Sequence, residues 1–416
     1  MHFRNLCQVS CLIALCFFFV PAAAQNTSIQ TADTAKKSSG HGSQPKDSIV
    51  VISDPAVVIT RQVEQFNQGA IFNPLDQLSG KVAGVTVTHP GGDPNQAASV
   101  SIRGQSSIFG NLSPLFVVDG VILDDAVEFQ NIPPEDIASY TILKDASAAA
   151  FYGARAANGV IIVTTKKGKA GHPVISYSGL VGSSVQSKYY DLLTPAEFRA
   201  AVGNQNGGFT DKGASTDWQK AINRRAWQQR NSLSVSGGSD NFNYLGGVDY
   251  QDQQGIILNS GKKELGLRFS GELKTLADKL DIKAGVQNVN TNRQFDDYDA
   301  FSYVFNAPPT SPVKNADGSY YAFSDFNLAN PAEHLNEEDL GGKEHLTLLH
   351  ASVDYSIIHD LKIGIFGSAN LNRTQSDGYI PSFPLEGNQS ESSHSDEHAH
   401  LYNGNIHLDY NKTFGI

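Results

Sequence analysis

The sequence predicts a membrane β-barrel, present only in part, that follows a smaller α+β domain. Beyond Gly171 several segments alternate apolar and polar residues, most clearly Leu265–Lys274 and Leu280–Gln287. No stretch after Val20 approaches the roughly 18 consecutive apolar residues of a membrane-spanning helix. Because a membrane protein without such helices satisfies its backbone only by closing a sheet, this long alternation is typical of a transmembrane barrel.

The N-terminus has the features of a secretory signal peptide, residues 1–24. Arg4 is followed by the apolar run Leu12–Val20 and by the small-residue cleavage site Ala22–Ala24. The run is too short to span a bilayer, so a retained anchor is the weaker interpretation. All three cysteines precede the cleavage site: Cys7, Cys11 and Cys16. Lipidation of Cys16 is disfavoured by its apolar neighbours, and the mature chain has no thiol for a disulfide, a zinc site or a nucleophile.

Residues 25–59 are predicted to be a linker that carries one short β-prone segment. Gln25–Lys46 is rich in Ser, Thr, Gln, Gly and Lys without apolar periodicity, which is typical of disorder. The segment that follows consists of Asp47, Ser48, Ile49, Val50 and Val51. High β-propensity beside a flexible tether suits a peptide that adds a strand to the sheet edge of a partner. Val57–Ile59 is a competing candidate, or the first strand of the next domain.

Residues 60–171 are predicted to form an α+β domain. Asn73 and Pro74 begin a short helix, as its cap and its first residue. Alternating or apolar runs then predict strands at Val85–Thr88, Ser99–Arg103, Leu115–Val118 and Val121–Leu123. Asp119 and Gly120, between the last two runs, are typical of a hairpin turn.

The stretch Asn131–Gly168 adds two helices and two strands. Pro133 and Pro134 suit the first turn of a helix, where a missing N–H donor costs nothing. Asp145 is predicted to cap a helix over Ala146–Tyr152 that Gly153 ends in a left-handed conformation. Val160–Val163 is predicted to be a buried strand, and the basic residues Lys166, Lys167 and Lys169 follow it.

The same stretch carries a family resemblance. The run LKDASAAAFYGARAANGVIIVTTKKGK, from Leu143 to Lys169, resembles the end of the plug domain of TonB-dependent outer-membrane receptors, in the form of their SusC/RagA branch. The earlier runs SIRGQSS and PLFVVDGV also resemble that plug, so the coverage is continuous from about Ala70 to Gly171. The resemblance implies a plug (60–171) inside the lumen of a barrel of about 22 strands. It also identifies Asp47–Val51 with the TonB box, the segment that TonB grasps from the periplasm.

Residues 172–416 are predicted to supply about eight antiparallel barrel strands. The alternating segments are Ile175–Val181, Leu233–Val235, Tyr244–Tyr250, Leu265–Lys274, Leu280–Gln287, Leu349–Ile357, Leu361–Leu371 and Ile406–Tyr410. A soluble β-sandwich would also alternate, but it would rarely place Arg268, Glu272 and Lys274 together on one wet face. An open sheet leaves two unsatisfied edges, so the chain is expected to be a fragment of a longer protein. An isolated eight-stranded barrel is the alternative, but side chains would fill its lumen and leave no room for a plug.

Charged residues and glycines of the predicted plug are the candidate residues for holding and gating it. They are Arg103, Gly104, Asp119, Gly120, Lys144, Asp145, Gly153, Arg155 and Gly159. Arg103, Lys144 and Arg155 are expected to pair with acidic groups on the inner barrel wall, either as fixed supports or as pairs that rearrange when TonB pulls. The glycines are expected to serve backbone geometry.

The sequence predicts no catalytic constellation, metal site or cofactor site. Gly153–Gly159 is bounded by glycines but lacks the Lys-Ser/Thr of a phosphate loop. His394, His398 and His400 lie among acidic and serine residues, so a solvated loop is expected there and metal binding is the less favoured alternative. The net charge of −11 and the lack of basic runs argue against a nucleic-acid partner.

The resemblance implies TonB-dependent import of a nutrient, of oligosaccharide or peptide type, across the outer membrane. It implies TonB as the periplasmic partner, a SusD-like surface lipoprotein over the barrel and outer-membrane lipid around it. An enzyme is not expected. A non-transporting surface protein or adhesin that retains a plug domain is the alternative, and a secreted hydrolase is a more distant one.

Overall fold

The computed structural model describes residues 58–62, 71–89, 91–104, 113–123, 125–144, 150–203, 211–295, 298–323, 329–383 and 389–411. All of them belong to one compact unit, Asp47–Ile416. The predicted signal peptide, residues 25–57 of the predicted linker with the Asp47–Val51 segment, and residues 145–149, which include Asp145, lie outside the described residues.

The plug domain is built on a mixed sheet of five strands in the order β1-β6-β7-β4-β5. These strands are β1 (Val58–Gln62), β4 (Leu115–Val118), β5 (Val121–Ile122), β6 (Ile137–Leu143) and β7 (Val160–Thr165). β4 and β7 run parallel, and the other pairs are antiparallel. A separate hairpin joins β2 (Val85–Thr88) to β3 (Ser99–Ile102). The strands predicted in this region are confirmed to within a residue or two.

Short helical turns connect these strands. The helix η3 (Pro74–Gln77) begins where predicted, and the Asn73 side chain accepts a hydrogen bond from the Leu75 N–H at 2.9 Å. The double proline gives a single 3₁₀ turn, η4 (Pro134–Asp136). Gly153, with φ 71° and ψ −161°, is not helical and separates two 3₁₀ turns within η5 (Ala150–Ala156), so the turn before it ends there, as predicted. The helix α1 (Ala126–Gln130), which Asp125 caps, was not predicted from the sequence.

The core of the plug domain continues into the wall beside it. Phe116 and Phe129 stack with ring centroids 4.7 Å apart, and Tyr140 meets Phe129 edge-on at 6.2 Å. The same apolar cluster includes three residues of the large sheet, which are Val289, Leu346 and Leu348. Plug and sheet are therefore packed together through one apolar core.

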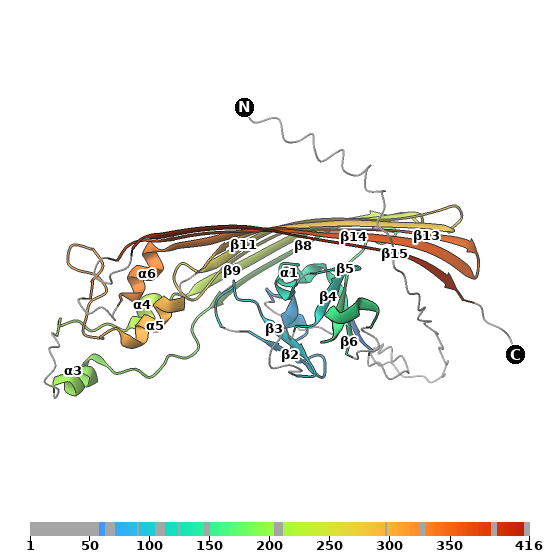
Figure 1. Ribbon diagram of the computed structural model, residues 1–416. Coiled ribbons are helices and arrows are strands. Elements are labelled where there is room, and N and C mark those ends of the chain that lie inside the picture. Colours follow the sequence, from blue (N-terminus) through green and yellow to red (C-terminus); the bar gives the residue numbers. More distant parts are fainter. Residues whose placement is uncertain are drawn as a thin grey trace, which may run out of the picture. The chain divides into compact units, whose positions relative to one another are not determined.

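The large sheet is an antiparallel meander of eight strands, β8 to β15 in sequence order, as predicted (Figure 1). The strands are β8 (Gly171–Ser184), β9 (Ala226–Gly238), β10 (Phe242–Gln254), β11 (Gly261–Thr275), β12 (Leu280–Gln294), β13 (Asp339–Ile358), β14 (Leu361–Ile380) and β15 (Glu391–Tyr410). Short turns (239–241, 276–279 and 359–360) lie at one end of the sheet, which we call the short-turn end. The other end, which carries the connections 185–225, 295–338 and 381–390, is called the long-connection end.

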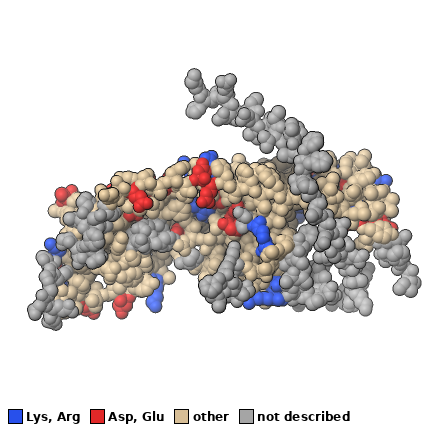
Figure 2. All heavy atoms as spheres, in the orientation of Figure 1, with Lys and Arg blue, Asp and Glu red and all other residues tan. Residues whose placement is uncertain are grey.

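The two faces of the large sheet differ as the alternation predicts. On the outer face, Phe269 and Ile365 keep 52% and 50% of their surface exposed. On the inner face, toward the plug domain, Arg268 is half-buried and Asn370 is buried. In the view of Figure 2, the charged side chains of the described residues lie in separate small groups among uncharged ones. No helix of the described segments is long and apolar enough to cross a membrane.

The long connections fold onto one another at their end of the sheet. They contain α3 (Pro195–Gly203), α4 (Trp218–Ile222), α5 (Tyr298–Asn306) and α6 (Pro331–Glu337). Trp218, Val304 and Leu335 belong to a second apolar cluster there. The Trp218 Nε1–H donates to the Pro308 carbonyl at 3.0 Å, which ties α4 to the segment after α5.

The histidines predicted to lie in a loop are instead part of a strand. His394, His398 and His400 belong to β15, which pairs with β14 along its whole length. The polar composition misled the prediction, because a strand that is exposed on both faces needs no apolar alternation to remain paired.

Candidate functional site

The contact between the plug domain and the inner face of the sheet is the candidate site. One of its most buried polar members is Glu128 of α1, of which 2% is exposed. Two asparagines of β14 donate to this carboxylate: Asn370 Nδ2 to Oε2 at 2.6 Å and Asn372 Nδ2 to Oε1 at 3.0 Å. Asp125 fixes the start of α1, since its carboxylate accepts from the Glu128 N–H at 2.9 Å. The carboxylate of Glu128 is thus presented to the wall by a capped helix.

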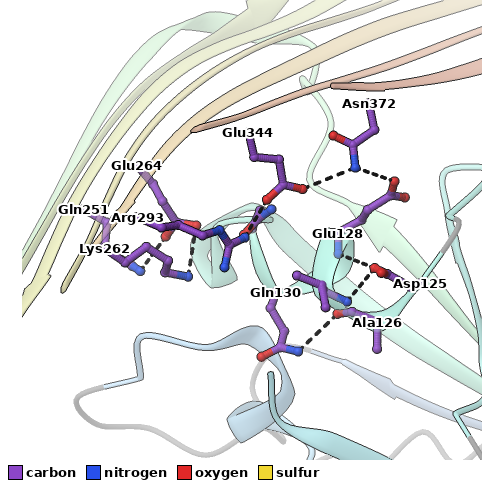
Figure 3. A network of polar contacts seen from close by, with 12 residues as sticks. Asp125, Ala126, Glu128, Gln130, Gln251, Lys262, Glu264, Arg293, Glu344 and Asn372 are labelled. Carbon is purple, nitrogen blue, oxygen red and sulfur yellow. Dashed lines mark hydrogen bonds and ion pairs between the residues drawn. The ribbon is translucent and has the colours of Figure 1, made fainter. Parts of the chain in front are cut away.

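The network continues along the wall (Figure 3). The same Asn372 amide lies 3.4 Å from Oε1 of Glu344 on β13. Oε2 of Glu344 pairs with Arg293 Nη2 of β12 at 2.5 Å. Arg293 also reaches back to the plug domain, where its Nη2 donates to Asn131 Oδ1 at 3.4 Å. Polar groups of α1 and of three adjacent strands therefore stabilise one another in a buried region.

A second charged contact involves the 3₁₀ turn η4. Arg230 of β9, 2% exposed, pairs with Glu135 through Nη1 and Oε2 at 2.9 Å. Its guanidinium also lies over the ring of Phe72, 5.3 Å from the centroid. Next to this pair, Arg268 of β11 contacts the Asp136 carboxylate. The two prolines before these acids set the turn and place both side chains toward the wall.

Asp136 is the most perturbed acid of the plug domain. Burial raises the pKa of its carboxyl well above the usual range, and the guanidinium of Arg268 lowers that pKa in turn. The nearby carboxylates Asp249 and Glu135 raise the pKa further. The contact with Arg268 is therefore what favours the ionised form of Asp136 at this depth.

Three of the candidate residues named from the sequence make contacts within the plug domain. Lys144 Nζ donates to the Ala83 carbonyl, and Arg155 Nη2 donates to the Leu123 carbonyl at 3.2 Å. Asp119 accepts from the Thr165 N–H at 3.1 Å and so joins the β4–β5 turn to β7. The expected pairing of Arg103, Lys144 and Arg155 with acids of the wall stays a prediction. The ion pairs of η4 with the wall have the reverse polarity, with the acid on the plug domain and the arginine on the sheet.

Four of the candidate glycines have the backbone conformation for which they were chosen. Gly104, Gly120, Gly153 and Gly159 have φ angles of 86°, 87°, 71° and 92°. Asp119 also has a positive φ, of 49°, which completes the hairpin turn with Gly120.

The residues that hold the plug domain to the wall were largely missed. Glu128 lies in a segment without a recognised pattern, and Glu135 and Asp136 follow the predicted double-proline turn without having been singled out themselves. Only Arg268 was marked in advance, by the alternation of β11. In the segments that the structure describes, no group of three or more His, Cys, Asp or Glu side chains could hold a metal ion. His394 Nδ1 instead lies 2.6 Å from Asp377 Oδ1 of the neighbouring strand.

Comparison with known proteins agrees with this architecture. Residues 52–160 match the family model of the TonB-dependent Receptor Plug Domain. The chain is 36% identical over 321 residues to the TonB-dependent receptor SusC of Bacteroides thetaiotaomicron, which covers 72% of this chain and 31% of the relative. A TonB-dependent receptor of Formosa agariphila is 30% identical over 321 residues, with 72% and 31% covered.

Among solved structures, the RagAB peptide importer in its closed-closed state matches with a TM-score of 0.75 and 23% identity. The match covers 88% of this chain and 46% of that chain, and at this identity it concerns the fold alone. The chain spans about 31% of the length of the two curated relatives. With a matching plug domain, an antiparallel sheet of eight strands and these relatives, the chain belongs to the TonB-dependent receptors of the SusC/RagA type.

Proposed function

We propose that this chain is the plug-bearing part of a transporter that imports a nutrient across the outer membrane with energy delivered by TonB. The observation that supports this most directly is how the plug domain is held. It is attached to the wall through buried polar contacts, such as Glu128 with Asn370 and Asp136 with Arg268, beside apolar contacts with residues such as Leu346. Such contacts fix a resting position but break once a single segment moves.

In this proposal the outer face of the sheet, with its exposed apolar residues, contacts outer-membrane lipid. The short-turn end faces the periplasm and the long-connection end faces the outside, as is usual for these barrels. Substrate enters from the long-connection end. TonB pairs with Asp47–Val51, and force on this segment reaches the plug domain through β1, the edge strand of its sheet.

The substrate is proposed to be an oligosaccharide or a peptide, and the partners to be TonB and a SusD-like surface lipoprotein. These proposals rest on the likeness to SusC and on the solved RagAB structure, which is described as a peptide importer. The residues that would select a substrate have no signature in the described connections.

The proposal is tested by pairing a proline with an alanine at one position. Val50→Pro removes the N–H that an added strand must donate, whereas Val50→Ala keeps it. The natural protein, purified from outer membranes, is titrated with the periplasmic domain of TonB. Cells with each variant are then grown on oligosaccharides or peptides as the only carbon source.

We expect Val50→Pro to abolish both TonB binding and growth, while Val50→Ala retains both. Equal TonB binding by the proline variant would overturn the assignment of the TonB box. Growth that never depends on TonB would overturn the transport proposal and favour a surface protein without transport.

A further inference from the structure

The plug domain meets the wall in two ways. On β13, Leu346 and Leu348 belong to the core of the plug domain and are 1% and 3% exposed, so part of this contact is apolar. Along β10, β11 and β12 the contact is hollow and includes buried charged groups such as Arg230 and Asp249, and Leu348 and His350 of β13 also line its cavities. Three cavities lie there between the plug domain and the inner face of the sheet.

The cavities follow one another along the inner face of β11. Glu264 and Gly266 line the upper cavity, nearest the long-connection end. Arg268 and Ser270 line the middle cavity, and Ser270 with Glu272 lines the lower one. We call this row of three cavities the seam. Because its lining residues are consecutive inner-face positions of one strand, the seam runs along the strand from one end of the sheet toward the other.

The chemistry of the seam is that of a hydrated space. The upper, middle and lower cavities measure about 20, 30 and 20 Å³, enough for ordered water, which needs about 10–15 Å³. Arg230 and Asp249 line the upper cavity and are buried. Nε and Nη2 of Arg230 and Oδ1 of Asp249 have no hydrogen-bond partner among the described residues. Leaving such groups dry costs about 1–3 kcal/mol each, so water must reach them.

One contact interrupts the seam. Arg268 stands between Gly266 of the upper cavity and Ser270 of the middle one, and its guanidinium contacts Asp136 of η4. The Asp136 side chain is 1% exposed, so this contact closes the space between the plug domain and β11.

We propose that the seam is a built-in path for small hydrated solutes, and that the contact of Arg268 with Asp136 is its gate. When Arg268 and Asp136 separate, solutes pass along β10 and β11. The apolar contact on β13 and the hydrogen bonds from Asn370 and Asn372 to Glu128 keep the plug domain attached. This inference deepens the proposed function and rests on it, because it names the side of the plug domain on which the passage opens.

Cysteine accessibility tests the path in the natural protein, in a background without other cysteines and reconstituted in lipid vesicles. Ser270→Cys places a thiol in the middle cavity, and Leu346→Cys places a matched thiol in the apolar contact. We expect a small cationic methanethiosulfonate to modify Ser270→Cys at least tenfold faster than Leu346→Cys. Equal rates would overturn the hydrated seam.

The gate is tested with Gln251→Cys, a thiol in the upper cavity, and reagent supplied only from the short-turn side. Adding Asp136→Asn removes the charge that holds Arg268, and we expect the rate of modification to rise at least tenfold. Should that variant fail to fold, Arg268→Lys shortens the reach to Asp136 and should also raise the rate. An unchanged rate in a folded variant would overturn the gate.

These measurements need neither TonB nor a known substrate. If the cysteines in the seam are modified but the protein does not bind TonB, the result contradicts the transport proposal and still supports the path. TonB binding with an unlabelled seam would contradict the path alone.

Discussion

Asn370 on β14 donates its side-chain amide to the carboxylate of Glu128 on α1 at 2.6 Å, across 242 positions of the chain. The pair joins α1, which carries one of the buried carboxylates of the candidate site, to the wall beside it. Local sequence does not single out either residue. α1 is short, and Asn370 is one of several polar residues on the inner face of β14. The pair is favoured because both side chains are removed from water, so the amide and the carboxylate each need a hydrogen-bond partner within the protein.

We therefore expect Asn370→Ala to loosen α1. The variant removes one of the two amides that hold the Glu128 carboxylate, and hydrogen bonds to charged groups contribute about 1.5–3 kcal/mol. The free energy of local opening, measured by hydrogen exchange of the Ala126–Gln130 amides, should fall by about that amount. Asn403→Ala, on the inner face of the next strand, is the control and should leave exchange in α1 unchanged. Equal effects of the two variants would contradict a specific role of the hydrogen bond from Asn370 to Glu128.

The two arginine pairs of η4 should differ in strength. Arg268→Met strands Asp136, which is 1% exposed, and breaking a buried pair costs about 3–5 kcal/mol. Arg230→Met leaves Glu135, which is 27% exposed and can hydrate, so a cost of about 1–3 kcal/mol is expected. Hydrogen exchange of the Ile137–Leu143 amides measures both.

The same pair predicts a pH effect in the Arg268→Met variant. Without the guanidinium, the already raised pKa of Asp136 rises further, and a protonated carboxyl tolerates burial. The variant should therefore recover stability as the pH falls through that pKa. A penalty that does not depend on pH would mean that the lost packing of the arginine stem, rather than a stranded charge, dominates.

The sequence predicted the repeating features of the fold well. Apolar alternation located all eight strands of the large sheet, because residues such as Phe269 and Ile365 must face an apolar surround while their neighbours face inward. It underestimated their length. In β12 the outer face turns polar at Asn288, yet pairing continues to Gln294. Backbone pairing does not require apolar side chains, so the alternation ends before the strand does.

The candidate site was harder to predict, for a different reason. Plug and wall contacts such as Glu128 with Asn370 depend on tertiary packing, which no local pattern encodes. The prediction placed basic residues on the plug domain and acids on the wall. The ion pairs of η4 have the opposite arrangement, with the acids on the plug domain and the arginines on the wall. Turn chemistry was more informative, and Gly104 and Gly120 have positive φ angles because their neighbours demand sharp turns.

His89 offers a pH test confined to the plug domain. A hydrogen bond from its ring to Asp76, with Nε2 and Oδ1 2.5 Å apart, raises the pKa of His89 above its usual value of 6.5. A raised pKa in the folded state means that the contact stabilises fully below the unfolded pKa. This stabilisation is lost as the pH rises through the folded pKa. NMR titration of the His89 ring should show the raised pKa, and Asp76→Asn should lower it; an unchanged value would exclude the contact in solution.

Alanine substitutions at Gly120 and Gly104 distinguish the effect of a steric contact from that of backbone strain. Both have positive φ angles, of 87° and 86°, so an alanine at either position is strained by about 1–2 kcal/mol. A Cβ at Gly104 would meet nothing within 4 Å, whereas at Gly120 it would lie 2.6 Å from Cζ of Phe366 on β14. Gly120→Ala should therefore destabilise the β4–β5 turn by more than Gly104→Ala destabilises the end of β3, as measured by hydrogen exchange at each site. Phe366→Ala should remove the excess in Gly120→Ala but not the strain that the two glycines share. If the double variant kept the full penalty, the turn would not approach the wall at Phe366, and the close fit of the plug domain against β14 would be wrong.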